Sequence, residues 1–258
     1  MRSWIVALWL LAVLTTANAA QATERRVALV VGNGAYKHLA ALSNPPVDVR
    51  AMAGFLKILG FEVIEGTNLS RDAMTEKLVE FGKIVKDADL AVFYYSGRDV
   101  AVGGAGYLLP IDADIKSEMD VKLGAAIDVA LTLDQTMSPA KIKLIFLDTA
   151  RINPLATGNL SPADRIADTS GRFEPDTLIA TADTAGHVVQ DDEKGAHSPF
   201  TRALIANIAS PGVEIEQAMT RVRAQVVQET SELQLPTERS YLLGSVYLAP
   251  VVAGSSGK

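Results

Sequence analysis

The chain has 258 residues, 48% of them hydrophobic, and its 24 Lys and Arg against 30 Asp and Glu give a formal net charge of −6. This acidic balance argues against nucleic acid as a partner, because phosphate contacts need a surplus of basic side chains on one face. The chain has no cysteine, which excludes disulfides, thiolate nucleophiles and thiolate metal sites. With 48% hydrophobic residues the chain can bury a large core, so we expect a fold that is stable without disulfides. We expect no metal and no cofactor.

The amino terminus has the pattern of a secretory signal peptide. Arg2 precedes an apolar segment from Trp4 to Leu14, and Ala17-Asn18-Ala19 has the small-x-small pattern that signal peptidase accepts. About eleven apolar residues are too few for a membrane-spanning helix, which needs roughly twenty, so a retained anchor is the weaker alternative. We expect residues 1–19 to be removed and the chain to be exported, periplasmic or extracellular, with no stable membrane insertion afterwards. Mass spectrometry of the exported chain would show a terminus near Ala20.

The first hundred residues alternate between strand and helix patterns. Three short apolar runs predict buried strands, at residues 26–31, 61–64 and 90–95. Two segments with apolar residues at helical spacing separate them, from about Pro46 to Gly60 and from Ser70 to Val85. This order predicts a parallel sheet with right-handed crossover connections, which is an α/β fold.

The alternation continues in the rest of the chain. A glycine-rich connection over residues 97–106 leads to a hairpin or edge ribbon. The apolar patterns then predict strands at 142–147, 177–182 and 246–248 and helices at 127–137, 198–208 and 215–229. Polar stretches predict surface loops at about 154–175 and 183–197. No linker divides the chain, so we expect one domain over residues 25–249 and a flexible tail over residues 250–258.

Polar side chains follow two of the predicted buried strands at the point where each ends. Ser96-Gly97-Arg98-Asp99 comes after one strand, and Asp148-Thr149-Ala150-Arg151 comes after another. Open α/β sheets bind ligands beyond the carboxyl ends of their strands. The sequence therefore predicts that both segments lie at one rim and that a site is located there.

Seven motifs, in this order, resemble the caspase-like cysteine peptidases (peptidase family C14), in particular their bacterial metacaspase-like branch. They are A-L-V-V-G-N-x-A-Y at 28–36, N-P-x-x-D at 44–48, F-Y-Y-S-G at 93–97, G-Y-L-L-P-I-D-A at 106–113, L-D-x-A-R-x-N-P at 147–154, T-L-I-A-T-A at 177–182 and S-P-F-T at 198–201. The resemblance covers about Arg25 to Leu248. It implies a caspase-like three-layer α/β/α sandwich around a six-stranded, mostly parallel sheet whose last strand is antiparallel.

Catalysis in the family, as the resemblance implies, needs a His directly after the Ser-Gly of the third strand and a Cys two residues after the Asp of the fourth. The imidazole keeps the thiol reactive, and neighbouring backbone N–H groups hold the oxyanion. In this chain the two dyad positions are Arg98 and Ala150. Alanine has no nucleophilic atom and a guanidinium is no base at neutral pH, so we expect a catalytically inactive homologue.

The resemblance also implies binding residues. The Asp at position 148 lines the pocket for a basic substrate residue in metacaspases, and Arg98 and Asp99 lie at the same rim, so all three are the predicted substrate-binding residues. We expect a pseudo-peptidase that binds a peptide or protein through the inherited cleft. Because the third and fourth strands are neighbours in the family, we also expect an ion pair in which Arg98 plugs the cleft at Asp148.

Two other functions stay open. One is a hydrolase with a relocated centre built on Thr149 or Ser96. The other is a structural scaffold that forms a homodimer through the last strand, because residues 246–252 are apolar for an edge. The three histidines, His38, His187 and His197, fall in predicted loops, and we expect them to lie at the surface.

Overall fold

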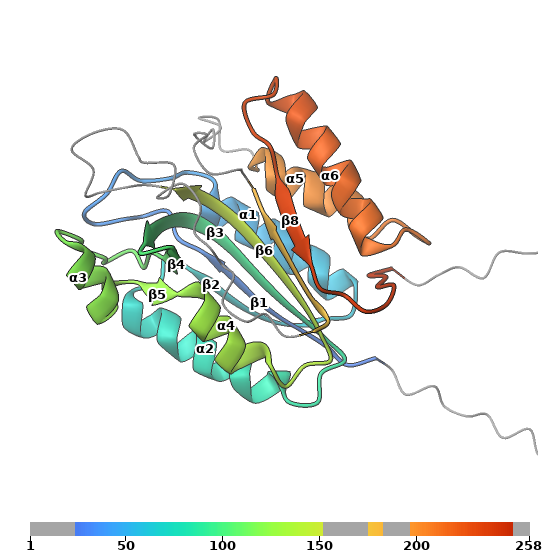
Figure 1. The fold of residues 1–258 in the computed structure, drawn as a ribbon, viewed down its shortest axis with the longest axis horizontal. Coiled ribbons are helices and arrows are strands. Elements are labelled where there is room, and N and C mark those ends of the chain that lie inside the picture. Colours follow the sequence, from blue (N-terminus) through green and yellow to red (C-terminus); the bar gives the residue numbers. More distant parts are fainter. Residues whose placement is uncertain (1–23, 152–174, 183–196, 250–258) are drawn as a thin grey trace, which may run out of the picture.

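Figure 1 shows the computed structural model, which describes residues 24–151, 175–182 and 197–249. A sheet lies between two layers of helices. The expectations for the signal peptide at residues 1–19, for His187, for most of the two polar loops and for the tail at residues 250–258 fall outside the described residues. Within the described ranges, no helix is both long enough and apolar enough to cross a membrane.

Six strands form the main sheet, in the order β2-β1-β3-β6-β7-β8. Their bounds are β1 (Arg26–Gly32), β2 (Glu62–Thr67), β3 (Leu90–Val102), β6 (Ile142–Arg151), β7 (Thr177–Thr181) and β8 (Thr237–Ser240). The first five are parallel, and β8 is antiparallel to β7. The predicted sheet, mostly parallel with an antiparallel last strand, is confirmed.

Helices cover both faces of this sheet (Figure 1). One layer contains α1 (Pro45–Ile58), α5 (Pro199–Asn207) and α6 (Ile215–Glu229), and the other contains α2 (Arg71–Val85) and α4 (Val129–Met137). Alternate residues of each strand point to opposite layers: Val92 and Phe146 pack in the first core, and Phe93 and Ile145 pack in the second. Burial on both faces explains why these strands are continuous apolar runs in the sequence.

The strand β3 is longer than the sequence predicts. Its apolar run stops at Tyr95, yet the strand continues to Val102 and turns at Gly103 and Gly104, which have φ of 60° and 85°. It then pairs with the antiparallel strand β4 (Ala105–Leu108), so the predicted hairpin is confirmed. Polar residues continue the strand because β4 and β6 supply hydrogen bonds on its two sides.

The segment before β6 differs from the prediction in its first residues. Two short helical turns, α3 (Glu118–Asp120) and η1 (Val121–Ala125), precede β5 (Ile127–Asp128), which pairs with β4. The helix that we expected from residue 127 begins at Val129. Asp128 caps it, because its carboxylate accepts a hydrogen bond from the Leu131 N–H at 2.8 Å.

The predicted last strand at residues 246–248 is wrong. The observed edge strand is the polar β8, at residues 237–240. Val246 and Leu248 are buried in the core beside α6, and their carbonyl oxygens accept hydrogen bonds from Ile215 and from the Arg26 side chain. Val246 and Leu248, two of the apolar residues that suggest a homodimer edge, therefore fill the core instead.

Candidate functional site

The two predicted polar segments lie side by side at the carboxyl ends of the central strands. In the parallel pairing of β3 and β6, Ser96 is opposite Asp148, and Arg98 is opposite Ala150. The residues that occupy the two dyad positions are thus direct register partners. The rim predicted from the sequence is present in the structure.

Asp148 is buried at this rim, with 4% of its surface exposed. Its Oδ2 accepts a hydrogen bond from Thr201 Oγ1 at 2.7 Å and another from Ser198 Oγ. Ser198 is the N-cap of α5 and also accepts the Thr201 N–H at 3.0 Å. Burial raises the pKa of the Asp148 carboxyl, although its hydroxyl donors oppose the shift. The first turn of α5 therefore covers this carboxylate.

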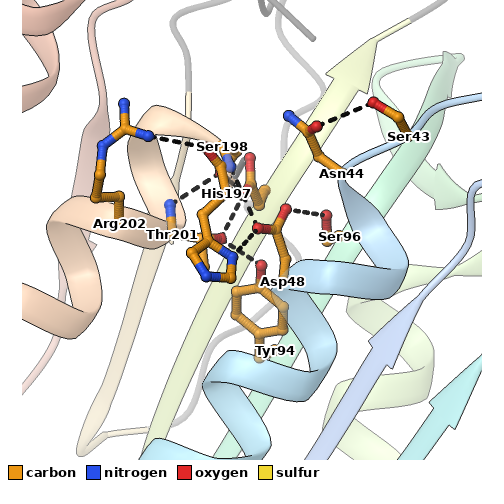
Figure 2. Close-up of polar contacts among 10 residues, drawn as sticks. Ser43, Asn44, Asp48, Tyr94, Ser96, His197, Ser198, Thr201 and Arg202 are labelled. Carbon is orange, nitrogen blue, oxygen red and sulfur yellow. Dashed lines mark hydrogen bonds and ion pairs between the residues drawn. The ribbon is translucent and has the colours of Figure 1, made fainter. Parts of the chain in front are cut away.

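A second carboxylate, Asp48 of α1, lies in the same region and is fully buried. Its Oδ1 is 3.1 Å from His197 Nδ1 and accepts the Ser198 N–H at 3.2 Å, while its Oδ2 accepts the Ser96 hydroxyl at 3.3 Å. Figure 2 shows Asp48 between Ser96 and His197. This single side chain connects α1, β3 and the start of α5.

Tyr94 completes the network from the floor of the site. Its hydroxyl is bonded to Thr201 Oγ1 (Figure 2). Because the one hydroxyl proton of Thr201 goes to Asp148, Tyr94 donates in this bond. Burial and the charges of Asp148 and Asp48 raise the pKa of Tyr94 well above its usual value. We call these residues the buried polar cluster: Asp48, Tyr94, Ser96, Asp148, His197, Ser198 and Thr201.

His197 is the one predicted surface histidine that the structure places in this cluster. It lies in the loop before α5 and its side chain is 36% exposed, which agrees with a surface loop, but the sequence does not predict its bond to Asp48. His38 is exposed as expected. Burial and the guanidiniums of Arg202 and Arg50 lower the pKa of His197. A neutral ring with its proton on Nδ1 satisfies the hydrogen bond to Asp48.

The predicted ion pair between Arg98 and Asp148 is wrong. Arg98 Nε donates to the Ala40 carbonyl at 3.0 Å, and the guanidinium carbon lies 5.9 Å from the centre of the Tyr36 ring. Asp148 is instead satisfied by the hydroxyls of α5. The guanidinium binds the loop after β1, because that loop offers it a carbonyl and an aromatic face.

Asp99 was predicted as a third binding residue. It is 4% exposed and lies inside β3, opposite Leu108 of β4 and Arg151 of β6. This burial argues against direct contact with a ligand. Of the three predicted residues, Arg98 alone has a half-exposed side chain.

The geometry disfavours a serine centre at Ser96. That hydroxyl is 3% exposed and donates to Asp48, so the carboxylate lies between Ser96 and His197. A serine nucleophile needs the imidazole beside its hydroxyl and the carboxylate behind the imidazole. In the part of the chain that the structure describes, neither Ser96 nor Thr149 has a hydrogen bond to a histidine, and no three acidic or histidine side chains gather as metal ligands.

The burial of Asp148 has a measurable consequence for pH dependence. Its pKa is raised in the fold, so its contribution to stability is full at low pH and is lost as pH rises above the unfolded value of about 3.9. The amide in the variant Asp148→Asn does not titrate, so the melting temperature of this variant relative to the unmodified chain should rise between pH 4 and pH 7. Thermal melts at several pH values measure this difference.

Asp89→Asn is the matched control for this series. A hydrogen bond from Lys141 lowers the pKa of Asp89. The melting temperature of Asp89→Asn relative to the unmodified chain should therefore fall as pH rises, which is the opposite direction. If the two variants give the same slope, Asp148 is not the destabilised carboxylate described above.

Comparison with known proteins adds independent findings. The caspase domain family matches residues 25–247. Caspase-1 of Rattus norvegicus is 27% identical over 250 residues, which cover 88% of this chain and 60% of that protein. Mucosa-associated lymphoid tissue lymphoma translocation protein 1 of Homo sapiens is 30% identical over 88 residues, 34% of this chain and 11% of that protein. This chain therefore spans less than two thirds of either relative.

A solved structure agrees with the fold. Caspase-1 from Spodoptera frugiperda superposes with a TM-score of 0.61 and 20% sequence identity, over 90% of this chain and 92% of that one. At this identity the likeness concerns the arrangement of helices and strands.

Proposed function

This chain belongs to the caspase domain family, and we propose that it is an exported pseudo-peptidase, which binds a peptide or protein at the strand rim without cutting it. The absence of any cysteine removes the thiol chemistry of the family. The proposal of export rests on the charged, apolar and small-x-small segments of residues 1–19.

The register between β3 and β6 is the observation that supports this proposal best. Arg98 and Ala150 are direct partners, at the rim where the resemblance places the imidazole and the thiol. The backbone of the two strands is paired up to Asp99 and Arg151, beyond the dyad positions. The paired backbones of β3 and β6 are kept although the imidazole and the thiol are absent, and this favours binding of a peptide over its cleavage.

A hydrolase with a relocated centre is the second candidate. It is disfavoured because Ser96 is buried and bonded to Asp48 rather than to an imidazole. A scaffold that dimerises through β8 is a third candidate, since β8 is the edge of the sheet. Unpaired strand edges are natural sites for pairing with another chain.

Incubation with a mixed peptide library separates the first two candidates. The purified chain should retain a subset of peptides in affinity selection and should generate no new peptide termini by mass spectrometry. A cysteine peptidase run on the same library shows that its members can be cut. New termini that disappear in Ser96→Ala or Thr149→Ala would establish the hydrolase instead.

A further inference from the structure

Among the rim residues that the structure describes, Arg98 has a charged side chain that is both held in place and half-exposed. Its Nε is hydrogen-bonded to the Ala40 carbonyl, and its plane is fixed near the Tyr36 ring. The backbone N–H of Arg98 donates to the hydroxyl of Tyr36 at 2.7 Å, which anchors the residue a second time. Within residues 24–151, 175–182 and 197–249, its two Nη groups donate to no atom.

We propose that Arg98 binds the free C-terminal carboxylate of a peptide that lies at the rim formed by β3 and β6. This inference rests on the proposed peptide-binding function and specifies its ligand. Arginine keeps its charge at every physiological pH, and its Nη pair matches the two oxygens of a carboxylate. Because Nε and the ring contact already fix the guanidinium, little side-chain freedom is lost on binding.

The cluster beneath the rim does not offer a competing site for a basic ligand. Asp148 and Asp48 are buried, and their oxygens accept hydrogen bonds from Ser198, Thr201, Ser96 and the start of α5. A ligand ammonium group would have to displace those donors and desolvate itself, which is unfavourable. Among Asp48, Asp99, Asp148 and Arg98, the charged residues described above, the one with a half-exposed side chain is the positive Arg98.

The register explains why the carboxylate should be a chain end. A nucleophile and its base must both reach the reacting carbonyl group. The resemblance places these two groups at positions 150 and 98, which are register partners here. An internal peptide carbonyl at this point is neutral and presents one oxygen, whereas a peptide that ends here presents two oxygens and a charge. Every linear peptide has such an end, and peptide-bond hydrolysis generates further ones, so the ligand class comprises native C-termini and the N-terminal fragments of cleaved proteins.

Matched peptide pools test this inference. The same synthetic peptides are prepared with a free C-terminal acid and with a C-terminal amide, and binding to the purified chain is measured by fluorescence anisotropy. The acid form should bind about tenfold more tightly, as expected for one charge-assisted bidentate contact. Arg98→Gln should remove the difference, and Arg98→Lys should restore part of it, because lysine keeps the charge but lacks the fork. Arg221→Gln, at an exposed position of α6, is the control for the loss of one positive charge.

The outcomes separate this inference from the proposed function. Equal binding of acid and amide forms would overturn the C-terminal ligand while leaving peptide binding intact. A preference that follows internal Asp and Glu rather than the chain end would identify a side-chain carboxylate as the ligand and also overturn the inference. Absence of binding by both pools would contradict the proposed function itself. Thermal melts of each variant show that a loss of preference is not a loss of fold.

Discussion

Replacing Asp48 by alanine should lower the free energy of unfolding by about 3 kcal/mol or more, since hydrogen bonds to a buried charge contribute roughly 1.5–3 kcal/mol each. The carboxylate accepts bonds from His197, from the Ser198 N–H and from Ser96, and it has no exposed surface. Alanine would leave these donors buried without an acceptor. It would also detach α1 from the start of α5, which covers Asp148.

Urea unfolding followed by circular dichroism measures this loss. Asp48→Asn is the graded variant, because one amide oxygen can keep some of the bonds. Asp89→Ala removes a carboxylate that pairs with Lys141 at the surface, and it should shift the unfolding midpoint little. If Asp48→Ala unfolds at the same urea concentration as the unmodified chain, Asp48 does not connect the three elements as described.

The sequence was sufficient for the layers of the fold because each central strand is buried on both faces. A strand such as 142–147 then has apolar residues on both sides, and its pattern differs from that of a half-buried helix. The end of β3 was missed because its last seven residues are held by backbone bonds to β4 and β6, whatever their side chains. The edge strand β8 was missed because its sequence, Thr-Glu-Arg-Ser, is polar and has no strand-like alternation.

The site could be predicted only in part. The sequence locates Asp148 and Arg98 because they follow the apolar runs of β6 and β3, but their hydrogen-bond partners come from distant segments. Ser198 is 50 positions from Asp148, and His197 is 149 positions from Asp48. Spacing along the chain contains no information on such pairs. The N-P-x-x-D and S-P-F-T motifs contain Asp48, Ser198 and Thr201, and they were the signal that pointed to these residues without assigning them a contact.

Restoring the dyad should have the largest effect on activity. The change combines Arg98→His and Ala150→Cys, with Asp99→Gly to recover the Gly that follows the His in the family. Positions 98 and 150 are direct register partners, so an imidazole and a thiol there start from paired backbones. A neighbouring imidazolium lowers the pKa of a thiol and makes the thiolate available at neutral pH. We expect covalent labelling by thiol-directed peptide warheads, together with slow peptide cleavage.

The rate of labelling is the sharper readout, because it needs no turnover. Ala150→Cys alone supplies a thiol without a base, and the restored dyad should react about a hundredfold faster than this control, as general-base assistance allows. The labelling rate of the restored dyad should also stay high at lower pH, because the thiolate persists there.

Asp99 is buried, so Asp99→Gly weakens the strand. The double variant Arg98→His with Ala150→Cys avoids this loss of stability and tests the dyad by itself. Warheads with acidic and with basic side chains are both needed, since Asp148 is covered by α5. If the double and triple variants are folded and react no faster than Ala150→Cys, then more than the two side chains separates this chain from an active peptidase.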